Sequence, residues 1–176
     1  NIPNSVTHIG NFAFAYTYNL TSITIPDNVV SFGSEVFNMS GISDITIGNG
    51  ITSIPIRTFY TCVNLTTVTL GANVTSIDNF AFSWCDNLTS VTLPEGLTSI
   101  GSYAFSDCER LSSIELPSTL STIGTSAFYG CASLPSVIIP EGITRIESTT
   151  FKDCSSMVYV EIPESVTYIG TGAFAE

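Results

Sequence analysis

The sequence predicts a mostly-β repeat solenoid that spans residues 1–176 as a single domain. Eight phenylalanines recur at steps of 23, 22, 23, 23, 23, 23 and 23 residues, and five cysteines recur at steps of 23. A fixed period of this kind is typical of stacked structural units. At this period the chain makes roughly 7.6 units, and both of its ends fall inside a unit. The two columns are Phe14, Phe37, Phe59, Phe82, Phe105, Phe128, Phe151 and Phe174, and Cys62, Cys85, Cys108, Cys131 and Cys154.

Each unit opens with a strand pattern. In the unit that starts at Leu88, the apolar residues Leu88, Val91 and Leu93 are separated by polar ones. The last two are two residues apart, which is the period of a strand with one buried face. A Pro or Gly then follows in every unit, and Pro ends a strand because it cannot donate to the ladder. These residues are Pro26, Gly48, Gly71, Pro94, Pro117, Pro140 and Pro163.

Two further parts complete the unit. The apolar pair Leu97 and Ile100 predicts a second, shorter extended segment. The third part carries Ala104, Phe105 and Cys108, and the three-residue step from Phe to Cys predicts a short helical turn that points both side chains inward. One unit cannot bury its own apolar side, so the units are expected to stack in register with the Phe and Cys columns inside.

The cysteine column has three readings. The favoured one is a row of buried free thiols that act as small hydrophobic side chains. Disulfides between neighbouring units lie within the usual Cα range, but parallel side chains hold the Cβ atoms too far apart, and an odd number leaves one cysteine over. A metal site requires closely spaced ligands, and a step of 23 residues without accompanying histidines does not supply them.

Composition and charge exclude several classes of partner and activity. The net charge is −11, with only four Lys and Arg residues, which are too few to neutralise a nucleic-acid backbone. No apolar run reaches the ~18 residues that a membrane span needs. The one histidine, His8, provides no nucleophile–base pair, and we find no phosphate loop or metal cluster. We therefore expect a non-enzymatic protein without a cofactor.

Five N-x-[ST] sequons are candidate N-glycosylation sites if the source has the machinery. Three of them share one position of the unit, just before the strand, where we expect an exposed corner. The five are Asn19, Asn38, Asn64, Asn73 and Asn87.

The repeating pattern L-x-x-[IV]-x-[IL]-P-x-x-[LV]-x-x-I-x-x-x-A-F-x-x-C resembles the BspA-type, Treponema-like leucine-rich repeat. The segments SITIP from Ser22 and SVTLP from Ser90 carry it plainly, whereas Gly48 and Gly71 replace the Pro, and Thr17 and Ser40 replace the Cys. The resemblance implies a curved right-handed solenoid with a parallel sheet on its concave face. It also implies a secreted or surface-exposed protein of bacteria or protist parasites that binds proteins of a host matrix or a neighbouring cell.

The outward strand positions form the candidate binding face of this leucine-rich repeat solenoid, because solenoids bind partners on such surfaces. The first four are threonines, and the later ones diversify. Threonine is also a common exposed strand residue, so a purely structural reading stays open. The positions are Thr24, Thr46, Thr69, Thr92, Glu115, Ile138, Tyr159 and Glu161.

Three functions remain open from the sequence. The leading one is an extracellular or cell-surface module for protein recognition or adhesion. The second is a structural subunit of a fibre or surface layer, which would assemble head to tail through uncapped solenoid ends. The third is ice binding through the Thr rows, although four rows on a curved face are few.

Overall fold

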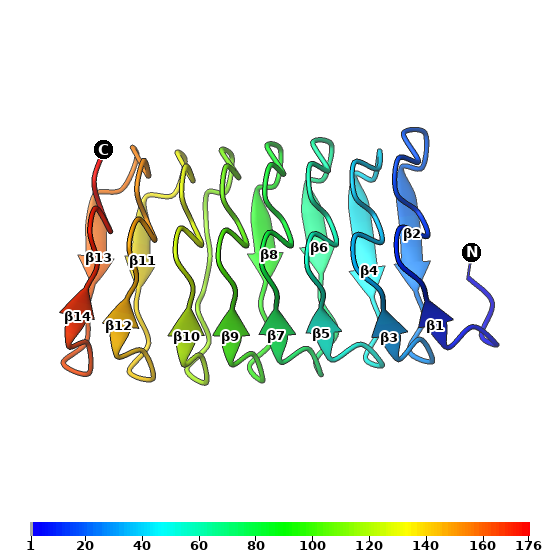
Figure 1. Ribbon diagram of the computed structural model, residues 1–176, viewed down its shortest axis with the longest axis horizontal. Coiled ribbons are helices and arrows are strands. Elements are labelled where there is room, and N and C mark those ends of the chain that lie inside the picture. Colours follow the sequence, from blue (N-terminus) through cyan, green and yellow to red (C-terminus); the bar gives the residue numbers. More distant parts are fainter. Residues whose placement is uncertain (1) are drawn as a thin grey trace.

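The computed structural model describes residues 2–176, and the chain forms a solenoid of stacked coils in one row (Figure 1). Every strand pairing is parallel and joins residues 22 or 23 positions apart, as in Ser22 with Asp44 and Thr67 with Ser90. The N-terminal and C-terminal coils lie at opposite ends of the row (Figure 1). This arrangement confirms the predicted repeat solenoid.

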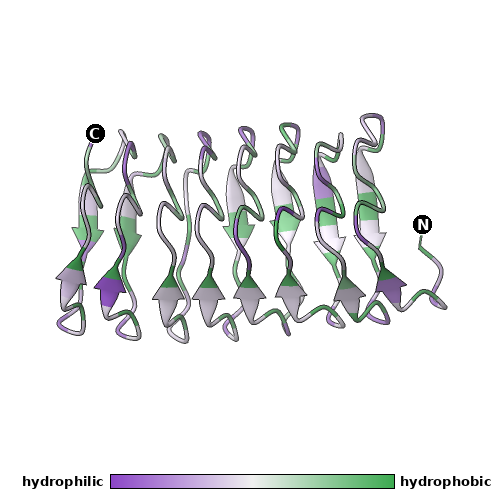
Figure 2. Ribbon diagram, viewed as in Figure 1, coloured by the Kyte–Doolittle hydropathy of each residue, from purple (hydrophilic) through white to green (hydrophobic). Residues whose placement is uncertain are grey.

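The longer strands follow one another along one side of the rod. We call the outward side of this row the strand face. Its strands are β2 (Ser22–Ile25), β4 (Asp44–Ile47), β6 (Thr67–Thr69) and β8 (Ser90–Thr92), which form one sheet, and β11 (Ser136–Ile138) with β13 (Tyr159–Glu161), which form another. In β4, β6 and β8 the Ile and Val side chains point inward and the residues between them are polar, which gives the alternation along the strands in Figure 2.

The predicted second extended segments are present as two-residue strands on the opposite side of the rod (Figure 1). They are β1 (His8–Ile9), β3 (Ser31–Phe32), β5 (Ser53–Ile54), β7 (Ser76–Ile77), β9 (Ser99–Ile100), β10 (Thr122–Ile123), β12 (Arg145–Ile146) and β14 (Tyr168–Ile169). Each of them except β14, whose Ile169 is exposed at the end of the rod, places one apolar residue into the core.

The third part of each unit is not a helical turn, and the sequence-based prediction is wrong here: residues 2–176 contain no helix. Successive backbone N–H groups in this part alternate between a hydrogen bond within the same coil and one to the next coil. The N–H of Ala104 donates to the carbonyl of Gly101 in the same coil (3.3 Å), whereas the N–H of Tyr103 donates to the carbonyl of Thr125 in the next coil (3.0 Å). A helix uses its N–H groups along its own axis, so it would lose these bonds between coils.

Left-handed backbone makes these turns possible. The residues two before and two after each column Phe have positive φ, apart from the C-terminal Glu176, and only Gly130 and Gly172 among them are glycines. For other residues this region costs roughly 1–2 kcal/mol, because Cβ crowds the following carbonyl. The others have φ between 53° and 61°: Phe12, Tyr16, Glu35, Met39, Arg57, Thr61, Phe80, Trp84, Tyr103, Asp107, Ser126, Thr149 and Asp153.

The phenylalanine column runs through the whole rod. Ring centroids of successive members are 5.0–5.4 Å apart, with interplanar angles of 13° or less. The six inner rings are at most 1% exposed, and Phe14 and Phe174 at the ends are partly buried. Stacking of identical rings therefore fixes the register between neighbouring coils.

All five cysteines are free thiols and are buried. Each Sγ donates to the carbonyl of the core Phe one coil back, as in Cys108 with Phe82 (3.1 Å). Burial raises the pKa of Cys62 to about 11, against weaker opposing hydrogen bonds from Ser40. The thiols are thus protonated core residues at neutral pH.

Candidate interaction site on the strand face

The predicted threonine row lies on adjacent strands of the strand face. Thr24 faces Thr46, Thr46 faces Thr69, and Thr69 faces Thr92 in the parallel register. All four are exposed, and within residues 2–176 their hydroxyls make no hydrogen bond. These hydroxyls therefore face solvent.

A neighbouring row of hydroxyls is used inside the structure. The Oγ1 of Thr66 donates to the carbonyl of Ser43 (2.9 Å), and the Oγ1 of Thr89 donates to the carbonyl of Thr66 (3.2 Å). Such a bond joins one coil to the next and contributes about 0.5–1.5 kcal/mol to stability. Part of the high Thr and Ser content is thus structural.

The strand face is interrupted between β8 and β11. In that interval the only β-pairing is an isolated bridge between Ser90 and Ser113, and residues 114–117 are not in a strand. Four prolines follow one another in the coils on this side, at Pro94, Pro117, Pro140 and Pro163. Each lacks the N–H that would continue the ladder.

Glycines stand at the same unit position where the sheet is continuous. A Cβ added at Gly71 would collide with the carbonyl oxygen of Gly48, so these coils approach more closely there than a larger residue would allow. Proline at this position does not by itself remove the pairing, because Pro140 and Pro163 follow β11 and β13, which pair over three residues.

Two grooves flank the interruption. One, of about 490 Å³, lies between β8 and residues 113–118 and includes Leu93, Glu95 and Glu115. The other, of about 480 Å³, lies between residues 112–116 and β11 and includes Glu115 and Ile138. The predicted site residues Glu115 and Ile138 thus lie together at these grooves.

A larger hollow, of about 590 Å³, lies on the opposite side over β7, β9 and β10. It is lined by Ser, Thr and Gly residues together with isoleucines, Asp78, Asn79 and Glu147. It includes none of the outward strand positions selected from the sequence.

Tyr159 and Glu161 extend the site along β13. In the register of β11 and β13, Ser136 faces Tyr159 and Ile138 faces Glu161. The Oη of Tyr159 donates to Oε2 of Glu161 (3.2 Å), and this hydrogen bond raises the pKa of Tyr159. Ile138 is 61% and Tyr159 is 54% exposed, so an aliphatic and an aromatic side chain stand beside a carboxylate.

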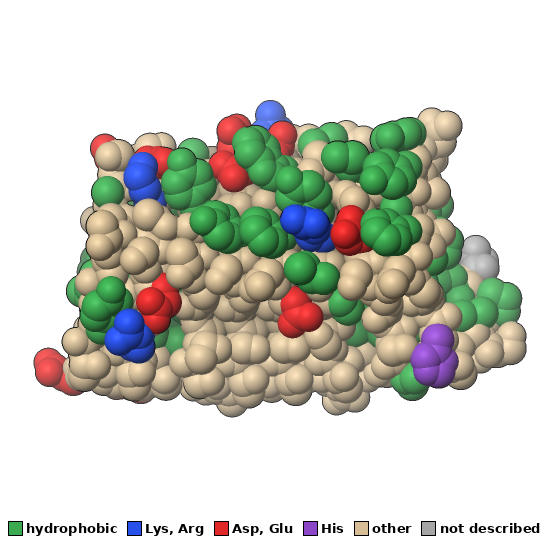
Figure 3. Space-filling model, viewed as in Figure 1, with side chains coloured by type: hydrophobic (Ala, Val, Ile, Leu, Met, Phe, Trp, Pro, Cys, Tyr) green, Lys and Arg blue, Asp and Glu red, His purple; other side chains and the backbone are tan. Residues whose placement is uncertain are grey.

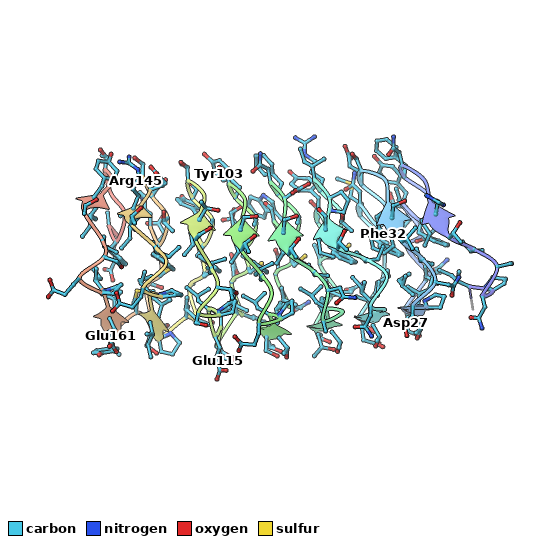
Figure 4. The ribbon with its side chains drawn as sticks, turned by 90° about the horizontal axis from the view of Figure 1, so that it is seen from below. Asp27, Phe32, Tyr103, Glu115, Arg145 and Glu161 are labelled. Atoms are coloured by element: carbon cyan, nitrogen blue, oxygen red, sulfur yellow. The ribbon has the colours of Figure 1, made fainter. Side chains whose placement is uncertain are left out.

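The charge on the strand face has one sign. Asp44, Glu115 and Glu161 are exposed there, and no Lys or Arg lies in its strands or in residues 113–117. Figure 4 shows Glu115 and Glu161 on the side of the longer strands, away from Arg145 and Tyr103. This face therefore favours cationic groups on a partner.

The sequons differ in accessibility. Asn38 is only 5% exposed, and its Nδ2 donates to Oε2 of Glu35 (2.8 Å), so this candidate glycosylation site is corrected to a buried residue. Asn38 lies in the unit that is one residue shorter than the others, where this coil lies close against the backbone of the preceding one. Asn19, Asn64 and Asn73 are exposed, and Asn87 is half-buried with its Nδ2 on the carbonyl of Val63 (2.7 Å).

Sequence reasoning missed a second surface, which we call the turn edge. The rings of Phe80 and Tyr103 stack at 4.9 Å, and the guanidinium of Arg57 lies 5.4 Å from the Phe80 centroid. Figure 3 shows hydrophobic side chains gathered along the turns, with basic and acidic side chains among them. The sequence signal for this surface was the pair of positions two residues before and two residues after each core Phe. Their side chains point outward only because the backbone there is left-handed. Its most exposed aromatic and Met members are Phe12, Tyr16, Tyr18, Met39, Trp84 and Tyr103.

Metal and membrane sites find no support in the described part of the chain. Residues 2–176 contain no group of three or more His, Cys, Asp or Glu side chains placed to hold a metal ion. They also contain no helix of the length and apolarity required to cross a bilayer.

Comparisons with known proteins agree with this architecture. A family model described as "BspA type Leucine rich repeat region (6 copies)" matches residues 1–89 and 75–176. A leucine-rich repeat protein of T. pallidum superposes with a TM-score of 0.84 and 25% identity, over 93% of this chain and 77% of that one. A search of curated proteins finds no match.

Two other solved structures are similar over most of this chain. A leucine-rich repeat protein from Bacteroides ovatus has a TM-score of 0.62 and 27% identity, over 99% of this chain and 57% of that one. A leucine rich cell surface protein from Faecalibacterium prausnitzii has a TM-score of 0.58 and 30% identity, over 96% of this chain and 62% of that one.

Proposed function

Because this chain belongs to the BspA-type leucine-rich repeat family, we propose that it is a non-enzymatic module that recognises a protein through its strand face. Leucine-rich repeat proteins generally mediate protein–protein interactions, and solenoids do so on their stacked-strand surfaces. An extracellular or cell-surface location is part of the proposal. The similar protein from Faecalibacterium prausnitzii is described as a cell surface protein, which supports that location.

The observation that carries this proposal is the coincidence of two changes on the strand face. The outward residues change from threonine to Glu115, Ile138 and Tyr159 at the point where the sheet is interrupted and two grooves open. The rest of the face carries a threonine at the same position of each strand and, apart from Asp44, only Ser and Thr beside it, which offers a partner little to distinguish one coil from another.

The chemistry of this region suits a protein partner. An exposed Ile, an exposed Tyr and nearby carboxylates give an apolar centre with polar neighbours, as protein interfaces usually have. The proposed partner is a protein of a host matrix or of a neighbouring cell surface.

The test measures binding of the chain to a panel of immobilised soluble extracellular-matrix glycoproteins by biolayer interferometry. The double variant Ile138→Ser with Tyr159→Ser removes the apolar centre, and we expect affinity for any bound glycoprotein to fall by about tenfold or more. The matched control is Thr46→Ser on the uniform row, which should bind as the wild type does. Equal binding by all three proteins would place recognition elsewhere on the molecule.

The uniform row supports a second candidate, binding to ice. Thr24, Thr46, Thr69 and Thr92 present free hydroxyls in register, at the roughly 4.8 Å spacing of parallel strands. A regular hydroxyl array is what an ordered water lattice can match. Thermal hysteresis measured on the purified protein tests this candidate, and freezing at the equilibrium melting point would reject it.

A further inference from the structure

We propose that the turn edge around Trp84 binds an arginine side chain of a partner protein, through contacts with the indole ring and the neighbouring carboxylates. The turn edge and the strand face are formed by different parts of each coil, so this inference stands apart from the proposed function. Three features carry it: an exposed indole ring, a repeated arrangement of cations against rings elsewhere in the chain, and carboxylates near Trp84 that form no ion pair.

The first feature is the exposure of Trp84. It is the only tryptophan of the chain and is 46% exposed, and Tyr103 in the next coil is another exposed ring of the turn edge. Within residues 2–176 the indole stacks on no other ring, and no Lys or Arg lies over it. Exposed apolar side chains in a group mark interaction surfaces, and tryptophan is enriched among the residues that dominate protein interfaces. We therefore expect a partner to cover this ring.

The second feature is the way in which the chain places its own basic residues. Three of its four Lys and Arg residues each lie against the aromatic ring that holds the same position in an adjacent coil, with 3.9–5.6 Å between the charged group and the ring centroid. Each also has a carboxylate oxygen 2.9–3.8 Å away. A cation over a ring face is attracted by the ring quadrupole, and the carboxylate adds an ion pair. The three sets are Arg57 with Phe80 and Glu35, Arg145 with Tyr168 and Glu147, and Lys152 with Tyr129 and Asp153.

The third feature is that the surroundings of Trp84 contain a ring and carboxylates but no paired cation. Asp107 holds the position of Trp84 in the next coil, and the left-handed backbone of both, with φ of 58° and 61°, turns their side chains outward. Asp86 and Glu109 likewise share one position of these two coils. Arg110 follows Glu109 in the sequence, but it is exposed and forms no ion pair within residues 2–176. This part of the edge therefore lacks the cation that the other three sets possess.

The three carboxylates lie close enough to repel one another. Burial raises the pKa of Asp86, and the charge of Glu109 raises it further. Burial also raises the pKa of Asp107 against an opposing hydrogen bond from Ser106, and the charges of Glu109 and Asp86 add to the rise. A cation bound among these groups would relieve the repulsion, so the charge of this surface complements a basic side chain.

Arginine is the cation that this arrangement favours. Its guanidinium is planar, so it can stack on the indole, and its N–H groups form a fork that can donate to two carboxylate oxygens at once. The ammonium of lysine is a compact point charge without a plane to lie on the ring. A phosphate or an acidic side chain would be repelled by the carboxylates. The partner is therefore a protein that presents an exposed arginine.

The experiment uses a capped Gly-Arg-Gly-Arg-Gly peptide as the probe and the fluorescence of Trp84 as the signal. Because the chain has no other tryptophan, a change in emission reports on this position alone. One control peptide carries citrulline, which keeps the shape of arginine and removes its charge, and a second carries lysine. We expect saturable quenching by the arginine peptide, at least about fivefold weaker binding of the citrulline peptide and about twofold weaker binding of the lysine peptide. No saturable change in emission, or equal binding of the arginine peptide and either control, would overturn the proposal.

Two double variants test the carboxylates. Asp107→Asn with Glu109→Gln removes two of the carboxylates near Trp84 and should weaken binding of the arginine peptide by about five- to tenfold. The matched control is Glu141→Gln with Glu164→Gln, which removes two exposed carboxylates that follow β11 and β13 at one position of adjacent coils. This control should leave the affinity unchanged. Equal weakening by both pairs would show general attraction to the net charge of −11 and would contradict a site at Trp84.

Two single variants test the ring, with binding followed by isothermal titration calorimetry because one of them removes the fluorophore. Trp84→Ala should weaken binding of the arginine peptide by about threefold or more. Tyr18→Ala removes a ring that is 67% exposed near the N-terminal end of the rod, and it should leave the affinity unchanged. Both side chains are exposed, so both variants should keep the far-UV circular dichroism spectrum of the wild type. If Trp84→Ala binds the peptide as tightly as the wild type does, the indole is not a contact and the proposal is wrong.

Discussion

Replacing Phe105 with alanine removes one ring from the middle of the phenylalanine column. Phe105 is fully buried, and its ring stacks at 5.0 Å on Phe82 and at 5.4 Å on Phe128, with interplanar angles of 2°. Truncation of a buried Phe costs about 3–5 kcal/mol, and an aromatic pair is worth roughly 0.5–1.5 kcal/mol beyond its buried area. Because two such pairs are lost, we expect the free energy of unfolding to fall by about 4–5 kcal/mol.

The matched control is Phe174→Ala at the end of the same column. Phe174 is partly buried and stacks on Phe151 alone, at 5.4 Å. We expect this change to cost about 1–2 kcal/mol, since less apolar area is withdrawn from water and one stacking pair is lost. The comparison separates the stability contributed by a ring in the middle of the column from the general effect of losing a phenyl group.

Urea unfolding followed by far-UV circular dichroism measures both variants. Each coil contacts only its neighbours, so a weakened central coil can also uncouple the two halves of the rod. We therefore expect Phe105→Ala to lower the m-value or to split the transition, and Phe174→Ala to do neither. A loss below about 1 kcal/mol for Phe105→Ala, or equal losses for the two variants, would refute the stacked column as the main source of stability.

Further predictions concern the thiols, the turns and the buried hydroxyls. The folded protein should leave its cysteines unlabelled by a thiol reagent at neutral pH, and unfolding without reductant should reveal five thiols; one thiol would mean disulfides. Burial raises the pKa of Cys62 to about 11 in the folded protein. The contribution of this thiol to the free energy of unfolding is therefore complete below the pKa of the unfolded cysteine and is lost as the pH rises through 11. Unfolding curves measured at increasing alkaline pH test this loss. Thr61→Gly should stabilise by about 1 kcal/mol because Thr61 has φ 57°, whereas Gly130→Ala should destabilise because its Cβ would lie 2.7 Å from a carboxylate oxygen; thermal unfolding tests the opposite signs. Ser83→Ala should cost about 1–3 kcal/mol because it orphans the Oγ of Ser106, 2.8 Å away, and the double Ser→Ala variant should recover part of the loss in urea unfolding.

The phenylalanine column and the row of outward threonines were predictable because each unit carries the same residue at the same position. The spacing of Phe14 through Phe174 placed the rings in one register, and the strand pattern placed the outward threonines on one face. The geometry of the turns was not predictable from the same units. A step of three residues from Phe105 to Cys108 fits a helical turn and a left-handed turn equally well. The choice depends on hydrogen bonds to the next coil, which no single unit contains.

The interruption of the strand face also escaped sequence reasoning. The segment Ser113–Pro117 has the same strand pattern as Ser90–Pro94, which forms β8. The prolines of neighbouring coils do not account for the difference, because Pro140 and Pro163 follow β11 and β13, which pair over three residues. Glu115 and Ile138 were selected from the sequence as outward residues, but only the coordinates place them at the two grooves.

At the left-handed columns, the path of the backbone does not depend on which side chains the turn edge carries. Their φ values stay within a narrow range although the residues include Phe, Glu, Arg, Trp and Asp. The backbone therefore accepts very different side chains there without a change of path, while the rings and thiols beneath remain constant. Mutations at the turn edge can accumulate and be selected for new contacts, or for escape from old ones, at little risk to folding.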